Sequence, residues 1–170
     1  MKKLMIASAI AMTMTAGSAM ASHGEVQFLG SVTAQTCDLE PEVNGAINKL
    51  IQLGTATVNG DAKPVDFVLK AKDPAACTEA DKLGASVSWG GNLSADGITN
   101  QRGSANGAYV ELKGKNAKVG NDKVVSSTFT KVEFEQGKLS GEGLQFTAQL
   151  KGGSTAGDYS SAVAYAVTYQ

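Results

Sequence analysis

Histidine is nearly absent from this sequence, and its scarcity leaves little material for catalysis by side chains. The one histidine, His23, would have to serve any Ser–His–Asp triad or Cys–His pair. Zinc-type metal sites need clustered His and Cys, and Asp61, Asp96 and Asp122 lack the D-x-D-x-D-G spacing of a calcium loop. The sequence therefore predicts no catalytic residue, metal or cofactor. A catalytic pair of carboxylates, as in glycosidases, remains an alternative, because the sequence does not show which residues meet in the fold.

A surplus of positive charge is also lacking. The 170 residues include 15 basic and 16 acidic side chains, with no run of Lys or Arg. Binding to nucleic acid needs a basic patch, so no nucleic-acid partner is predicted. Beyond the N-terminal region, no stretch is long and apolar enough to cross a membrane.

The N-terminus has the three parts of a secretory signal peptide. A basic start with Lys2 and Lys3 precedes the apolar residues 4–16, and Ala19-Met20-Ala21 forms an A-x-A cleavage site. We expect a signal peptide over residues 1–21 and a mature chain that begins at Ser22. The remaining 149 residues carry a net charge of −3 and suffice for one domain.

Cysteine occurs twice, at Cys37 and Cys77. Exported proteins meet an oxidising compartment, so an even number of cysteines predicts a disulfide between them. Such a bond closes a 41-residue loop, counting both cysteines. Two separate buried thiols remain the alternative.

Apolar residues alternate with polar ones along most of the chain, which is the period of β-strands. Clusters of Gly, Asn, Asp and Ser separate the alternating stretches and predict turns. Short strands at this spacing indicate an all-β sandwich or barrel, with one helical turn allowed in residues 73–82. The alternating rows are Val26/Phe28/Gly30/Val32/Ala34, Val65/Phe67/Leu69/Ala71, Leu83/Ala85/Val87/Trp89, Ala108/Val110/Leu112, Val132/Phe134, Leu144/Phe146/Ala148/Leu150 and the C-terminal strand.

Trp89 has two interpretations. It is followed by Gly90 and Gly91, and an exposed Trp beside glycines could stack on a sugar. However, it also ends an unbroken apolar row, which favours a place in the core.

The last fourteen residues, GDYSSAVAYAVTYQ, form the most regular strand of the sequence. Its bulky side chains share one face, which only Ser161 interrupts, while the other face is small or polar. A terminal segment is usually loose unless something holds it, so this strand needs a partner. The residues on the bulky face are Tyr159, Val163, Tyr165, Val167 and Tyr169.

Several features occur together in an order that resembles the subunits of bacterial chaperone–usher fimbriae of the type 1 pilus class. A signal peptide precedes the alternating segment Gly24/Val26/Phe28, and Cys37 follows soon after. The sequence IQLG then stands at 51–54, and Cys77 follows it. Gly157 lies fourteen residues from the end, and Tyr169 is the penultimate residue.

The resemblance implies an all-β, incomplete immunoglobulin-like sandwich that lacks its last strand and is completed by a donated one. It implies that residues 22–29 are an N-terminal donor-strand extension carrying Gly24, Val26 and Phe28, and that residues 30–170 are the pilin domain. The acceptor groove, which also binds the chaperone, would be formed by Gly157, Tyr159, Val163, Tyr165, Val167 and Tyr169. Implied partners are copies of the protein, other fimbrial subunits, a periplasmic chaperone and an outer-membrane usher.

The expected function is that of a structural subunit, exported through the periplasm into a surface fimbria that supports cell adhesion. Two alternatives stay open. The subunit could itself bind a host-cell glycan, or the chain could be a free periplasmic β-sandwich enzyme.

Overall fold

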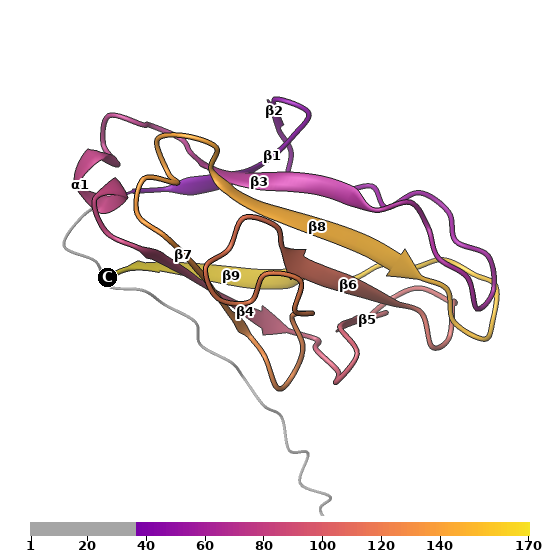
Figure 1. Cartoon of the computed structure of the whole chain (residues 1–170). Coiled ribbons are helices and arrows are strands. Elements are labelled where there is room, and N and C mark those ends of the chain that lie inside the picture. Colours follow the sequence, from indigo (N-terminus) through magenta and orange to yellow (C-terminus); the bar gives the residue numbers. More distant parts are fainter. Residues whose placement is uncertain (1–36) are drawn as a thin grey trace, which may run out of the picture.

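The computed structural model describes residues 37–170, which form two β-sheets packed face to face (Figure 1). The signal peptide and the segment 22–29 lie outside the described residues. All strand pairs within the two sheets are antiparallel. The prediction of an all-β sandwich is confirmed.

The larger sheet has six strands in the order β2-β1-β3-β8-β6-β5. Its centre is the pair β3 and β8, in which Phe67 lies opposite Phe146. The strands are β1 (Leu39–Val43), β2 (Ala46–Ile47), β3 (Val65–Ala71), β5 (Ile98–Thr99), β6 (Tyr109–Gly114) and β8 (Leu144–Lys151).

The smaller sheet has three strands in the order β7-β4-β9. β7 (Lys131–Phe134) and β9 (Val163–Tyr169) both pair with β4 (Ala85–Gly91), so β9 forms one edge of this sheet. Among the described strands, β9 therefore has a neighbour on one side only.

Aromatic side chains from both sheets form the centre of the core. The rings of Phe67 and Phe146 stack at 5.5 Å, and Trp89 meets Phe146 edge-on at 5.2 Å. Trp89 is 5% exposed, which confirms the core interpretation and leaves no indole face for a sugar. Phe134 on β7 adds a further edge contact with Phe146 at 5.4 Å.

A disulfide joins Cys37 to Cys77, as predicted, with 4.8 Å between their Cα atoms. It links the start of β1 to α1 (Thr78–Asp81), the single helical turn expected in residues 73–82. Within residues 37–170 this helix is the only one, and it is too short to cross a membrane.

Most of the strands predicted within residues 37–170 form, with three differences. The last strand begins at Val163 and does not include residues 157–162, Ala108 precedes β6, and Leu83 lies outside β4. The predicted row from Val26 to Ala34 lies outside the described residues. The amide of Leu83 donates to the carbonyl of Ala80 and so closes the turn after α1, while β4 begins only at Ala85. Leu83 is therefore 43% exposed and does not extend the core row. Parity alone placed it in the strand, but the helical turn before it sets the direction of its side chain.

Candidate functional site: an open groove beside the last strand

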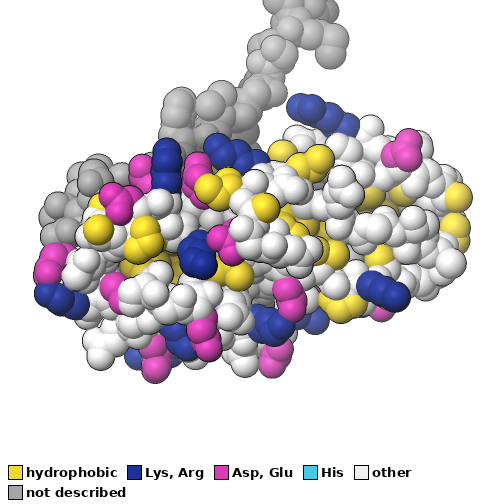
Figure 2. Space-filling model, turned by 90° about the horizontal axis from the view of Figure 1, so that it is seen from above, with side chains coloured by type: hydrophobic (Ala, Val, Ile, Leu, Met, Phe, Trp, Pro, Cys, Tyr) yellow, Lys and Arg dark blue, Asp and Glu magenta, His cyan; other side chains and the backbone are white. Residues whose placement is uncertain are grey.

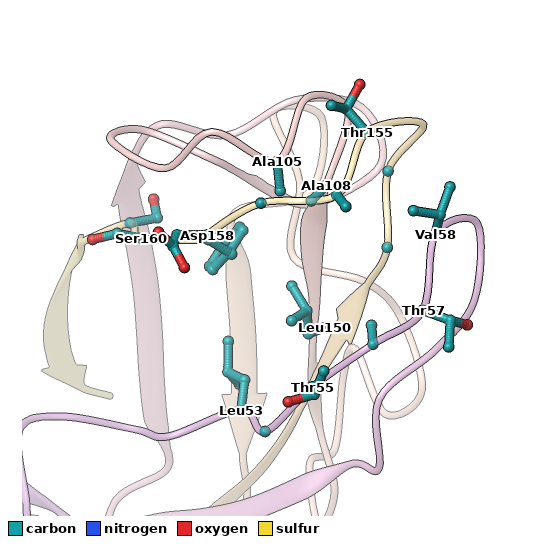
Figure 3. Close-up of a pocket in the computed structure, with 18 of the residues that line it drawn as sticks. Leu53, Thr55, Thr57, Val58, Ala105, Ala108, Leu150, Thr155, Asp158 and Ser160 are labelled. Carbon is teal, nitrogen blue, oxygen red and sulfur yellow. The ribbon is translucent and has the colours of Figure 1, made fainter.

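An open groove runs beside β9. Two hollows of about 760 Å³ and about 240 Å³ share lining residues and so form one continuous depression. The shared residues are Leu50, Ile51, Leu53, Tyr159 and Ser161. Figure 3 shows the larger hollow, with Leu53 and Thr55 on one side, Asp158 and Ser160 on the other, and Leu150 between them.

The first wall of the groove is β9 with the residues that precede it. Its bulky side chains face the core but are only half-buried, unlike the inward residues of the central strands. Gly157, Tyr159, Val163 and Tyr165 all line the groove. Val167 and Tyr169 lie on the same strand and face but are not among its lining residues.

Three tyrosine hydroxyls tie this wall to the other sheet. Tyr165 donates to the carbonyl of Leu39 at 2.7 Å, and Tyr169 donates to the carbonyl of Cys37 at 2.8 Å. Tyr159 donates to the carbonyl of Ile98 at 3.0 Å. The tyrosines thus hold β9 in place across the sandwich, while its other edge pairs with no strand of residues 37–170.

The same three side chains resist ionisation. Burial raises the pKa of Tyr159 to about 12. Burial, followed by the nearby Asp38 carboxylate, raises the pKa of Tyr169 to about 12. Burial also raises the pKa of Tyr165, with smaller contributions from the carboxylates of Glu40 and Asp38. The hydroxyls therefore remain protonated donors throughout the physiological pH range.

The second wall is the segment 50–58, which belongs to no strand. Leu50 is 68% exposed and Val58 is 47% exposed, while Ile51 and Leu53 turn partly toward the core. Among contacts between described residues, no amide of residues 51–58 donates a hydrogen bond. This wall therefore offers apolar side chains and backbone amides that donate to no group in residues 37–170.

The floor of the groove is the hydrophobic core itself. Figure 2 shows hydrophobic side chains in an interrupted band along the molecule, with charged groups of both signs around it. A surface with exposed apolar side chains and an unpaired strand edge is typical of a site that binds another strand. The core residues that line the floor are Phe67, Leu69, Trp89, Ile98, Val110, Leu112 and Ala148.

Four of the six residues expected in an acceptor groove, Gly157, Tyr159, Val163 and Tyr165, line this depression, while the opposite wall was not predicted. The alternating residues of the last strand identified the β9 wall. The segment 50–58 has no periodic pattern, and its one signal in the sequence is IQLG at 51–54, which the family resemblance included without a role. Gly24, Val26 and Phe28 lie outside the described residues. Within residues 37–170, no group of three or more His, Cys, Asp or Glu side chains is placed to hold a metal ion.

Comparison with known proteins identifies the relatives of this chain. No family model matches it. The F107 fimbrial protein of Escherichia coli is 45% identical over 171 residues, covering 100% of both chains. The K99 fimbrial protein of Escherichia coli is 30% identical over 182 residues, covering 99% of both. The Major MR/P fimbria protein of Proteus mirabilis is 24% identical, covering 100% of this chain and 99% of that protein.

Among solved structures, the P pilus rod subunit PapA matches with a TM-score of 0.49 and 20% identity, over 86% of this chain and 100% of that one. The full-length identity to the F107 and K99 proteins is what establishes the relationship, and it confirms the resemblance read from the sequence. The chain belongs to the family of chaperone–usher fimbrial subunits.

Proposed function

We propose that the protein is a structural subunit of a surface fimbria and that it polymerises by donor-strand exchange. The observation that carries the proposal is the edge of β9 that pairs with no other described strand, where half-buried apolar side chains line a groove whose floor is the hydrophobic core. In a fimbrial subunit, this edge is where a strand from a neighbouring copy would pair. The filament that results would support adhesion of the cell that carries it.

The occupant that we propose is the segment 22–29 of a second copy. Eight extended residues span about 26 Å, and the seven residues of β9 span about 23 Å, so the lengths agree. The donated side chains of Val26 and Phe28 would enter the groove on one face, and Gly24 would allow a close approach of the two backbones. Inserting Phe28 into an apolar groove contributes roughly 1.5–3 kcal/mol at each junction.

Before assembly the groove needs another occupant, because exposed apolar side chains and an unpaired strand edge promote aggregation. We propose that a periplasmic chaperone lends a strand to β9, and that the exchange takes place at an outer-membrane usher. The chain would then pass from the periplasm to the cell surface, where copies of itself and other fimbrial subunits are its neighbours.

The test compares donor and acceptor lesions with matched controls. Phe28→Asp should leave chaperone binding intact but block filament growth, because it puts an unpaired charge into the neighbour's groove. Tyr165→Asp should block both chaperone binding and growth. The controls are Gln27→Asp, on the opposite parity of the donor, and Thr168→Asp, on the exposed face of β9.

Chaperone pull-down followed by electron microscopy of filaments measures both steps. The two controls should bind the chaperone and assemble normally. Phe28→Asp should bind the chaperone but form no filaments, and Tyr165→Asp should do neither. Normal filaments from Phe28→Asp, or loss of chaperone binding in that variant, would show that the donor and acceptor roles are assigned wrongly.

A further inference from the structure

The residues just before β9, 157–161, form the outer part of the groove wall without a strand to support them. We call them the rim segment. The ladder between β4 and β9 ends where Gly91 faces Val163, so β4 does not reach the rim segment. All five of its residues nevertheless line the larger hollow. Another part of the molecule must hold it in line with β9.

The side chain of Asn100 bonds to the rim segment at the positions that β4 does not reach. Its Nδ2 donates to the carbonyl of Asp158 at 3.1 Å and to the carbonyl of Ala105 at 2.9 Å. Its Oδ1 accepts from the amides of Ser160 and Gly103, both at 3.0 Å. One carboxamide thus uses both of its donors and both of its acceptor positions to join the rim segment to the loop 100–105.

Backbone bonds from the same loop complete this support. The amides of Gln101 and Arg102 both donate to the carbonyl of Ser160, at 2.9 Å and 3.0 Å. The amide of Ala105 donates to the carbonyl of Asp158 at 3.0 Å. The loop and the rim segment are also in close contact, because a Cβ atom on Gly103 would lie 1.7 Å from the carbonyl oxygen of Asp158.

All of these bonds use the even-numbered residues of the rim segment. In an extended chain, the backbone groups of successive residues point to opposite sides. At the other end of the wall, Gln170 has the same parity and exchanges both backbone bonds with Gly84, on the β4 side. The odd-numbered residues Tyr159 and Ser161 therefore direct their backbone groups toward the groove. Neither of their amides donates a hydrogen bond to another described residue.

We propose that Asn100 is a positioning residue that extends the strand-accepting edge beyond the end of β4. A donated strand then pairs with Tyr159 and Ser161 as well as with β9. This inference rests on the proposed function, and its occupant is the same segment of a second copy. Without the Asn100 carboxamide the accepting edge stops near Val163.

Asn116 provides a matched control away from the groove. Its Nδ2 donates to the carbonyl of Gly143 at 3.0 Å, and its Oδ1 accepts from the amide of Gln145 at 2.9 Å. It therefore also joins two distant parts of the chain through one carboxamide. Asn116→Ala removes a comparable set of bonds without touching the rim segment.

The experiment is residue-resolved hydrogen exchange on the mature chain refolded with a synthetic peptide of residues 22–35. In the unaltered protein, the peptide should protect the amides of Tyr159, Ser161, Tyr165 and Val167. Asn100→Ala should raise exchange at Tyr159 and Ser161 by roughly tenfold or more, a change of about 1.4 kcal/mol in local opening, and leave Tyr165 and Val167 protected. Asn116→Ala should leave all four protected.

A second variant guards against general unfolding. Asn100→Asp keeps the oxygen that accepts from Ser160 and Gly103 but places a second oxygen against the carbonyls of Asp158 and Ala105. It should show the same local loss in a folded chain. Unchanged exchange at Tyr159 and Ser161 in both variants, or an equal loss in Asn116→Ala, would overturn the role of Asn100. A peptide that protects no amide of 157–170 in the unaltered protein would overturn strand docking itself, and the role of Asn100 with it.

Discussion

β8 and β9 have the same alternating pattern in the sequence but different surroundings in the fold. β8 pairs with β3 on one edge and with β6 on the other, and its inward residues Leu144 and Phe146 are completely buried. β9 pairs with β4 alone among the described strands, and its inward residues stay half-buried. Figure 1 shows β8 in the middle of one layer and β9 in the other. An alternating row thus specifies the face that a strand buries, while the number of its neighbours decides how much of that face is covered.

On the function proposed above, the difference also separates what makes the subunit fold from what makes it assemble. The residues of β8 complete their contacts within one chain. Those of β9 keep capacity for a further strand, in side-chain contacts and in backbone hydrogen bonds. The predictions below change one of these strands or its supports and compare the results.

The largest effect is expected in β8. Phe146→Ala removes a ring that contacts Phe67, Trp89 and Phe134, and a cavity of that size costs about 3–5 kcal/mol. Chemical unfolding of the strand-complemented subunit should show this loss whether peptide or chaperone fills the groove. A loss that disappears when the groove is filled would mean that the core depends on the occupant, and would remove the distinction between β8 and β9.

Loss of the disulfide comes next. Replacing Cys37 and Cys77 by Ser should cost about 2–5 kcal/mol, because the unfolded chain is no longer constrained. The carbonyl of Cys37 accepts the Tyr169 hydroxyl, so this change should also loosen the end of β9. Unfolding curves with and without reductant measure the stability, and the unaltered protein under reductant should match the Ser variant. Two titratable thiols in the oxidised, folded protein would contradict the bond.

Filling the groove should stabilise β9 and hardly change β8. A peptide of residues 22–35 at 100 times its Kd should add about 2.7 kcal/mol to the free energy of unfolding. The mature chain without any partner should aggregate or be degraded in the periplasm. A monodisperse empty subunit that melts cooperatively at the same temperature with and without peptide would count against an open groove.

The buried face of each of these strands could be predicted from the local alternation of apolar and polar residues. The rows around Phe67, Trp89 and Phe146 identified the core, because a period of two fixes which side chains share a face. The bulky face of the last strand was equally plain in the sequence. Its interpretation as one wall of a groove came from the family resemblance, since a periodic row does not reveal how many strands lie beside it.

What could not be predicted depends on residues far apart in the chain. The segment 50–58 forms a wall only because the fold brings it to the open side of β9, and its own sequence has no period. Asn100 bonds to residues 58 and 60 positions away, a pairing that no local pattern encodes. Leu83 was misplaced for a local reason, because a helical turn interrupts the row just before β4 begins.

Alkaline pH should loosen β9 before it affects β8. Since burial raises the pKa of Tyr159 and Tyr169 to about 12, above the usual value near 10, the folded state favours the protonated form. The stability from this difference is fully present below pH 10 and is lost as the pH rises toward 12. Hydrogen exchange and tyrosine absorbance should both change in this window, with the amides of β9 affected first. Uniform loosening of both strands would contradict this order.

The smallest effect is expected from a single hydroxyl. Tyr165→Phe keeps the ring against Trp89 but removes the hydrogen bond to the carbonyl of Leu39, at a cost of about 0.5–1.5 kcal/mol. Tyr109→Phe on β6 is the control, because its hydroxyl makes no hydrogen bond with a described residue. Unfolding of the strand-complemented subunits measures both variants.

The bond to the Leu39 carbonyl explains why the loss of one hydroxyl should also affect peptide binding in the groove. β1 and β9 belong to different sheets, and the Tyr165 bond joins them on a strand whose one neighbour among the described strands is β4. Tyr165→Phe should therefore weaken peptide binding as well as stability, whereas Tyr109→Phe should change neither. Equal peptide affinity in both variants would show that the hydroxyl supports the fold alone, and that the position of β9 is set by its pairing with β4.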